Sequence, residues 1–77
     1  MAVTLLLTSG ERRVVKEGDA ARMDGPFFMV TRWDVGLQRP QTVLTLRSID
    51  VVSAEIQKDD ATTEIVLGAG ISIWQNN

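Results

Sequence analysis

The sequence contains no cysteine, no histidine and no tyrosine among its 77 residues. Without cysteine the chain cannot form a disulfide. Without cysteine and histidine it lacks the usual zinc ligands and the nucleophile–base pairs of most hydrolases. No apolar run approaches the roughly 20 residues of a membrane-spanning helix. A domain this small buries only about 60% of the surface of its unfolded chain, so association with another chain is the stabiliser left to consider.

The residues that remain offer few catalytic groups. The four serines have no histidine to activate them, and Asp59 and Asp60 form a turn signal rather than a catalytic pair. Asp50 interrupts an apolar run, where we expect its carboxylate to accept backbone N–H groups at a short turn or 3₁₀ segment. We therefore expect no catalytic residue, no cofactor and no metal site. A small enzyme whose site is shared between subunits is a third hypothesis.

Glycines at positions 68 and 70 form a short Gly-x-Gly sequence between two apolar segments. Phosphate-binding loops of this kind need a following helix and a Lys-Ser or Lys-Thr pair, and the sequence shows neither pattern here. We therefore interpret Gly68-Ala69-Gly70 as a kink or bulge within a strand.

Residues that favour strands are abundant: valine, isoleucine and threonine make up 21 of the 77 residues. Alternation of apolar residues predicts seven strands, at residues 3–8, 11–16, 27–33, 41–47, 49–57, 62–67 and 71–74. The apolar parity changes near Asp50, which predicts a bulge or corner there. We allow at most one short helical turn, near residues 19–23, capped by Asp19.

The predicted fold is all-β, a small antiparallel barrel or sandwich of five to seven short strands. Its strand order is SH3-like or Sm-like in architecture, and residues 1–77 form one small domain. The N-terminus lacks the charged flank and the longer apolar region of a secretory signal, so we expect a cytoplasmic protein that does not interact with membranes.

The net charge of −2 is unevenly distributed. Residues 1–47 carry seven positive and five negative charges, whereas residues 48–77 carry one positive and five negative charges. Arginines and aromatic residues alternate over residues 22–47, a combination by which small barrels bind single-stranded nucleic acid. The candidate anion or nucleic-acid contacts are Arg22, Arg32, Arg39 and Arg47, with Trp33 as a stacking platform.

Several predicted strands are apolar on both faces, and an exposed apolar face usually marks an interaction site. Residues 71–74 would form an edge strand without lysine or proline, which invites pairing with another chain. The candidate interface residues are Trp33, Ile71, Ile73 and Trp74. The leading hypothesis is a non-enzymatic binding or assembly module that acts as a homo-oligomer, with itself or another protein as partner and an unknown ligand. The alternative is a single-stranded nucleic-acid-binding barrel.

Overall fold

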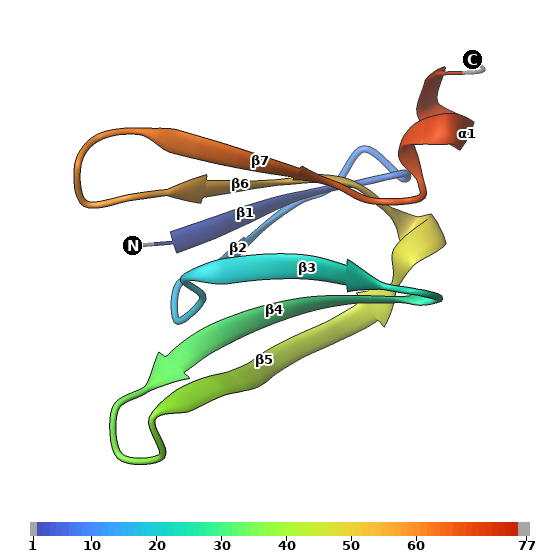
Figure 1. Ribbon diagram of the computed structural model, residues 1–77. Helices are drawn as coiled ribbons and strands as arrows, with labels where there is room; N and C mark the ends of the chain where they lie inside the picture. Colours follow the sequence, from blue (N-terminus) through green and yellow to red (C-terminus); the bar gives the residue numbers. More distant parts are fainter. Residues whose placement is uncertain (1, 76–77) are drawn as a thin grey trace.

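A computed structural model describes residues 2–75 as two antiparallel β-sheets packed face to face (Figure 1). The four-stranded sheet has the order β2-β1-β6-β7, and the three-stranded sheet has the order β3-β4-β5. The strands are β1 (Ala2–Leu7), β2 (Arg12–Val15), β3 (Ala20–Asp24), β4 (Phe27–Asp34), β5 (Arg39–Arg47), β6 (Val51–Gln57) and β7 (Thr63–Leu67). The predicted small all-β fold is confirmed.

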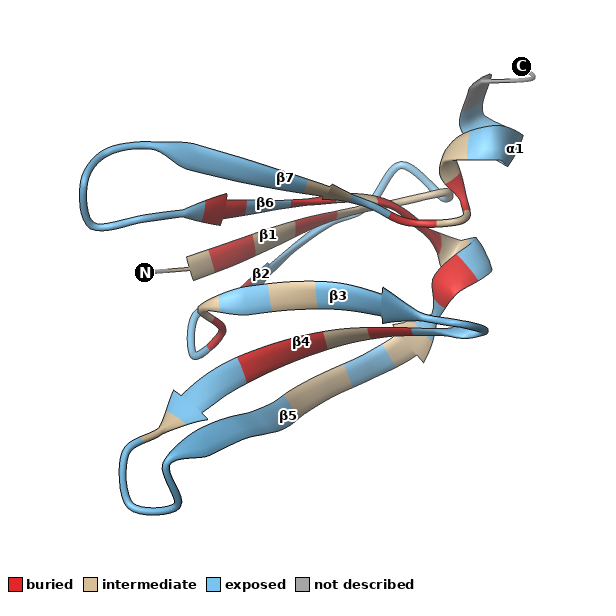
Figure 2. Cartoon of the chain, in the orientation of Figure 1, coloured by how far each residue is buried: buried red, intermediate tan, exposed pale blue. Residues whose placement is uncertain are grey.

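The core lies between the two sheets and is small. Phe28 and Val30 of β4 meet Val3, Leu5 and Ile56 of the opposite sheet, and each of these side chains is at most 1% exposed. Figure 2 shows the buried segments concentrated on β1, β4 and β6, while the remaining strands are mostly exposed. Each sheet therefore contributes one covered face, and the strands at the edges of the sheets contribute little to the core.

The first hairpin agrees with the sequence prediction. β1 and β2 pair antiparallel with Val3 opposite Val15, and the turn between them contains Gly10 at a φ of 91°. A positive φ is readily available only to glycine, which explains why this residue ends the turn.

The chain passes from one sheet to the other at the corner that the parity change predicts. A 3₁₀ helix, η1 (Ser48–Asp50), follows β5 directly, and β6 begins at Val51. The buried Ser48 anchors the corner, because its N–H donates to Pro26 at 2.8 Å and its hydroxyl to Gly25 at 3.0 Å. A register shift follows, with Leu6 opposite Ser53 but Leu7 opposite Val51. Both a corner and a bulge are present.

The predicted helical turn at residues 19–23 is wrong, because Ala20–Asp24 is the strand β3. The backbone of β3 pairs with β4 from Ala20 opposite Thr31 to Asp24 opposite Phe27. The Asp19 carboxylate does not cap a helix but accepts the Trp33 N–H at 3.0 Å. The cross-strand hydrogen bonds outweigh the weak helical preference of the two alanines.

The predicted strand at residues 71–74 is also wrong, because Ile71–Gln75 is a helix, α1. The preceding glycines press against the corner: the Gly70 N–H donates to Val51 at 2.9 Å and to Ser48 at 3.1 Å. A Cβ on Gly68 would lie 2.2 Å from the Val51 carbonyl oxygen. This close approach turns the chain out of the sheet, so the two glycines form a kink after which no strand resumes.

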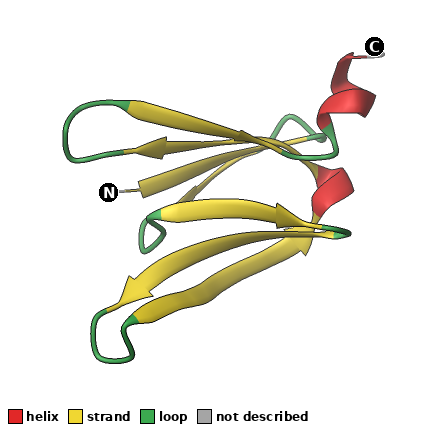
Figure 3. Ribbon diagram, viewed as in Figure 1, coloured by secondary structure: helices red, strands yellow, loops and turns green. Residues whose placement is uncertain are grey.

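The β4–β5 hairpin is longer than predicted. Only residues 35–38 form its turn, and Arg39 and Pro40 already belong to β5. The register between the two strands shifts after Val30, which pairs with Leu44, so that Val43 is an extra residue and forms a bulge. The loop at the end of this hairpin bends away from the four-stranded sheet (Figure 1, Figure 3).

Candidate functional site

Each sheet has an inner face that forms the core and an outer face that the described residues leave largely uncovered. Residues directly opposite each other on paired strands lie on the same face, so the strand register assigns every side chain to one face. The two outer faces are the largest continuous surfaces on which the sequence places unburied apolar and charged side chains. We therefore compare them as candidate sites.

The outer face of the four-stranded sheet includes two rows of side chains that cross all four strands. Across the order β2-β1-β6-β7, one row is Arg12, Leu6, Ser53 and Leu67, and the other is Val14, Thr4, Glu55 and Ile65. Val14 and Ile65 occupy opposite ends of one row and are 56% and 60% exposed. The face therefore has apolar side chains on both edge strands and one charge of each sign, on Arg12 and Glu55.

Helix α1 stands on the same side of this sheet, facing away from the three-stranded sheet (Figure 1). It is held at its start by the Trp74 N–H, which donates to the Gly70 carbonyl at 3.1 Å. Ile73 and Trp74 are nearly half exposed, and Ile71 is half-buried. Three of the four predicted interface residues thus lie beside the outer face of the four-stranded sheet, on a helix rather than on the expected edge strand.

The outer face of the three-stranded sheet has a different composition. Phe27 is flanked by Asp24 and Arg47, and Met29 is flanked by Arg22 and Thr45. Further along β4, Trp33 lies opposite Pro40 and is 50% exposed. A shallow hollow of about 150 Å³ on this face is lined by Arg22, Thr31, Pro40 and Thr42. Aromatic side chains at both ends of β4 therefore enclose a polar centre that contains a guanidinium group.

The four predicted arginines do not converge. Arg22 and Arg47 lie on the outer face of the three-stranded sheet. Arg32 and Arg39 lie on the opposite face of the β4–β5 hairpin, where the strand register places them across from Gln41 and Asp34. The fourth predicted interface residue, Trp33, belongs to this sheet and is separated from α1 by the whole sandwich (Figure 1).

The partner predicted for Asp50 is wrong. Its carboxylate lies in the expected 3₁₀ segment but accepts from the Arg47 guanidinium, at 3.0 Å and 3.4 Å, rather than from backbone N–H groups. The register shift at the corner leaves this carboxylate beside the last residue of β5. The Asp50 carboxylate therefore occupies the Arg47 guanidinium, and an anion that binds there must displace this carboxylate or share the guanidinium with it.

Two charged side chains on the outer face of the four-stranded sheet, those of Arg12 and Glu55, have no ion-pair partner among residues 2–75. Ion pairs join Arg13 to Glu11, Arg47 to Asp50 and Lys58 to Glu64, at 3.0–3.3 Å. Across residues 2–75, neither Arg12 nor Glu55 takes part in an ion pair. These two side chains are two strands and one row apart on the same outer face, and no ion pair joins them.

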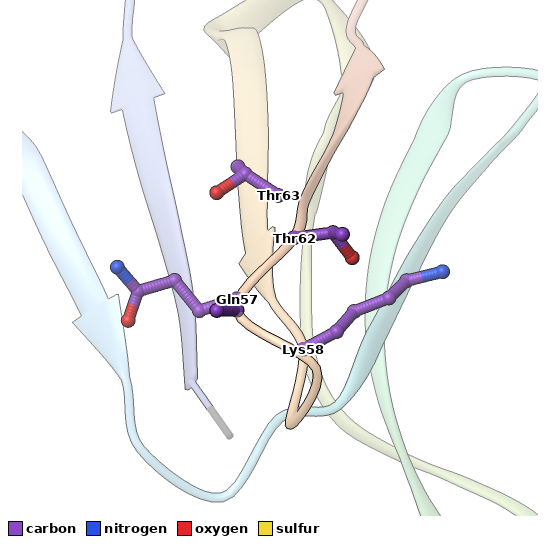
Figure 4. A pocket seen from close by; sticks show the side chains of 5 residues that line it. Gln57, Lys58, Thr62 and Thr63 are labelled. Carbon is purple, nitrogen blue, oxygen red and sulfur yellow. The ribbon is translucent and has the colours of Figure 1, made fainter.

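Three surface hollows measure about 260, 150 and 260 Å³, which is smaller than the roughly 300–1,000 Å³ of most small-molecule sites. One of them lies at the β6–β7 turn, where Figure 4 shows Gln57 and Lys58 extending to opposite sides of the hairpin. Another lies between the sheets near η1 and contains Arg13 and Asp50, both already engaged in ion pairs. None of the three brings free reactive groups together.

The β6–β7 turn contains Asp60, an aspartate with a lowered pKa. The Thr62 hydroxyl and the Thr62 backbone N–H both donate to the Asp60 carboxylate, and these two bonds, the hydroxyl first, lower the pKa of Asp60. This is the behaviour of a turn-forming aspartate, as the sequence predicts. Among the described residues, no three acidic side chains gather as a metal site would require.

Comparison with family models, curated proteins and solved structures finds no match. No helix among residues 2–75 combines the length and the apolar character needed to cross a bilayer.

Sequence reasoning missed the apolar side chains at the edges of the four-stranded sheet, Val14, Ile65 and Leu67. A signal for them exists, because residues 65–67 are all apolar and a strand cannot bury both of its faces on one core. The predicted interface instead followed tryptophan, the residue type most enriched at binding hot spots.

Proposed function

We propose that this protein is a non-enzymatic assembly module that functions as a homo-oligomer. The observation that supports the proposal is its exposed apolar surface. Within residues 2–75, eleven large hydrophobic side chains are 42–73% exposed, against nine buried hydrophobic residues. Several of them are neighbours on the outer faces of the sheets, and contiguous exposed apolar side chains usually mark an interaction site that a second chain can cover.

The test is a molar-mass measurement across concentration. Light scattering coupled to size-exclusion chromatography, with sedimentation equilibrium, covers about 10 µM to 1 mM, the range suited to a small interface. The expected result is a mass that rises with concentration from 8.5 kDa towards a multiple of it. A constant mass of 8.5 kDa up to the highest concentration would overturn the proposal.

Two finer features belong to the same proposal. One is an SH3-like or Sm-like arrangement, which is supported by the meander β3-β4-β5 and by the 3₁₀ helix that leads into β6 next to β1. The other is a cytoplasmic location, which is supported by the sequence features of the N-terminus. Localisation of a fluorescently tagged chain in its own cell tests the second feature.

A second candidate function is binding of single-stranded nucleic acid by the outer face of the three-stranded sheet. It is supported by the arrangement of Arg22 and Arg47 on the edge strands around Phe27 and Met29 of β4. Phe27 and Trp33 are six residues apart on one strand, about 20 Å, which is room for about three nucleotides between two stacking platforms.

Fluorescence anisotropy with labelled single-stranded DNA and RNA, at about 50 and 200 mM salt, tests this candidate. Arg22→Ala should weaken binding and lower the salt dependence by about one counterion, and Trp33→Ala should weaken it at both salt concentrations. Arg12→Ala, which removes a guanidinium from the other outer face, is the matched control and should leave binding unchanged. Absence of binding at the lower salt concentration would exclude this function.

A further inference from the structure

We propose that a second copy of this chain stacks on the outer face of the four-stranded sheet. The two copies are related by a two-fold axis that runs along the strands between β1 and β6. The inference rests on the proposed self-association and specifies which surface makes the contact and in which orientation. Its starting observations are the two rows of side chains on this face and the two charges on it that have no partner.

Charge decides between the two outer faces. The face of the four-stranded sheet carries Arg12 and Glu55, one positive and one negative charge, so the same surface on another copy can neutralise both. On the face of the three-stranded sheet, Asp50 already neutralises Arg47, and the remaining Arg22 and Asp24 lie two residues apart on the same strand, so this face has no widely separated opposite charges for a second copy to match. A two-fold contact uses the same patch twice, which favours the face whose charges complement themselves.

The register of the strands sets the contacts. A two-fold axis along the strands reverses the order β2-β1-β6-β7, so β2 of one copy lies over β7 of the other. Val14 then lies over the partner's Ile65, and two such apolar contacts form because the arrangement is symmetric. Sheets that pack face to face are about 10 Å apart, a distance that valine and isoleucine side chains fill.

The same axis brings the two unpaired charges together. Arg12 lies over the partner's Leu67, whose apolar surface the arginine stem can cover. From there the guanidinium is one strand and one row away from the partner's Glu55 in the plane of the sheets, and the two side chains extend towards each other across the gap of about 10 Å between the sheets. Each dimer would contain two of these ion pairs, and each pair would join charges that are unpaired among residues 2–75 of their own chain.

The size of the face sets the expected affinity. Four strands about 4.8 Å apart and about five residues long cover roughly 350 Å². The half-exposed Ile73 and Trp74 of α1 border this area and extend it. Standard interfaces bury about 800 Å² on each partner, so the contact should be weak, with a dissociation constant in the micromolar range or above.

Introduced cysteines test the orientation, because the native chain has none. Val14 and Ile65 are three strands apart in one chain, about 14 Å, so the V14C and I65C chains each carry their single thiol at a different edge of the face. With a short bis-maleimide cross-linker that spans the roughly 10 Å between stacked sheets, an equimolar mixture of V14C and I65C chains should yield covalently linked dimers in at least about tenfold excess over either variant alone. The matched control is a mixture of R22C and T45C chains, two residues at the edges of one row on the other outer face, which should stay monomeric.

Charge reversal provides a second measurement. Arg12→Glu and Glu55→Arg should each raise the dissociation constant by about tenfold or more, and the double variant R12E/E55R should restore it to within about threefold. Cross-linking in the R22C and T45C mixture but not in the V14C and I65C mixture would overturn the inference. A dissociation constant that is the same for the native chain and for all three charge variants would also overturn the inference. In either case self-association itself would stand, whereas a strictly monomeric native chain would overturn both.

Discussion

The two sheets are built alike on the inside and differ on the outside. Each contributes a strand of buried apolar residues to one shared core, with Phe28 and Val30 on one side and Val3 and Leu5 on the other. On the outside, the four-stranded sheet carries aliphatic residues with one separated charge of each sign, whereas the three-stranded sheet carries aromatic residues beside two arginines, of which Arg47 is paired with Asp50.

This difference separates two kinds of partner. Aliphatic residues with separated, balanced charges suit a copy of the same surface, while aromatic residues beside arginine suit a flexible polyanion. The buried parts of the inner faces, which are both apolar, cannot make that distinction. Stability and partner choice therefore reside on opposite faces of the same strands, and each can be perturbed separately.

The largest expected effect separates the two faces of β4. Phe28→Ala should lower the free energy of unfolding by about 3–5 kcal/mol, because the ring is 1% exposed and the small core has nothing to replace it. Phe27→Ala, one residue away on the outer face, should change it by less than about 1 kcal/mol. Urea unfolding followed by circular dichroism measures both. Equal losses would mean that the outer face is also covered, and the comparison of the faces would fail.

A smaller effect is expected at the kink that places α1. Gly68→Ala should cost about 3 kcal/mol, because the new methyl group would lie 2.2 Å from the Val51 carbonyl oxygen, a backbone atom that cannot move freely. Gly36→Ala, in the turn of the three-stranded sheet, meets its nearest atom at 3.4 Å and should cost well under 1 kcal/mol. Thermal unfolding compares the two. A tolerated G68A chain would show that the kink is not what ends the sheet.

The smallest expected effect concerns pH. The hydrogen bonds from Thr62 lower the pKa of Asp60 in the folded state, so they stabilise the fold above the pKa of the unfolded chain. This contribution disappears as the pH falls through the lower, folded value. Thr62→Val should raise the pKa of Asp60, while Thr63→Val, the matched control, should not change it. Carboxyl titration by NMR measures both variants, and an unmoved Asp60 in T62V would contradict the assigned cause.

Local patterns were enough to predict most of the sheet. The alternation over residues 27–33 correctly marks β4, and the change of parity near Asp50 correctly marks the corner. The two errors both involve contacts between residues far apart in the chain. Residues 19–23 are extended because β4 lies beside them, and residues 71–74 leave the sheet because Gly70 presses on Val51 and Ser48.

The candidate surfaces were harder to predict than the fold. The sequence prediction placed Trp33 and Trp74 in one interface, but Trp33 lies on β4 of the three-stranded sheet and Trp74 lies on helix α1. It also grouped four arginines, whereas the strand register places Arg22 and Arg47 on one face of the three-stranded sheet and Arg32 and Arg39 on the other. Grouping residues into one surface needs the pairing of strands, since neighbours such as Val14, Thr4 and Glu55 come from three separate segments.

The extra residue Val43 also limits how chains can add to one another edge to edge. β5 is the longest strand and pairs only with β4 among the described strands, so its other edge is a template for another chain. The bulge at Val43 shifts the alternation of the backbone hydrogen-bonding groups between the two halves of β5. At one end of the strand, Pro40 also lacks a backbone N–H. An incoming strand can match one half of β5 but not both. Open-ended growth through this edge is thereby hindered, while closed contacts between faces are unaffected.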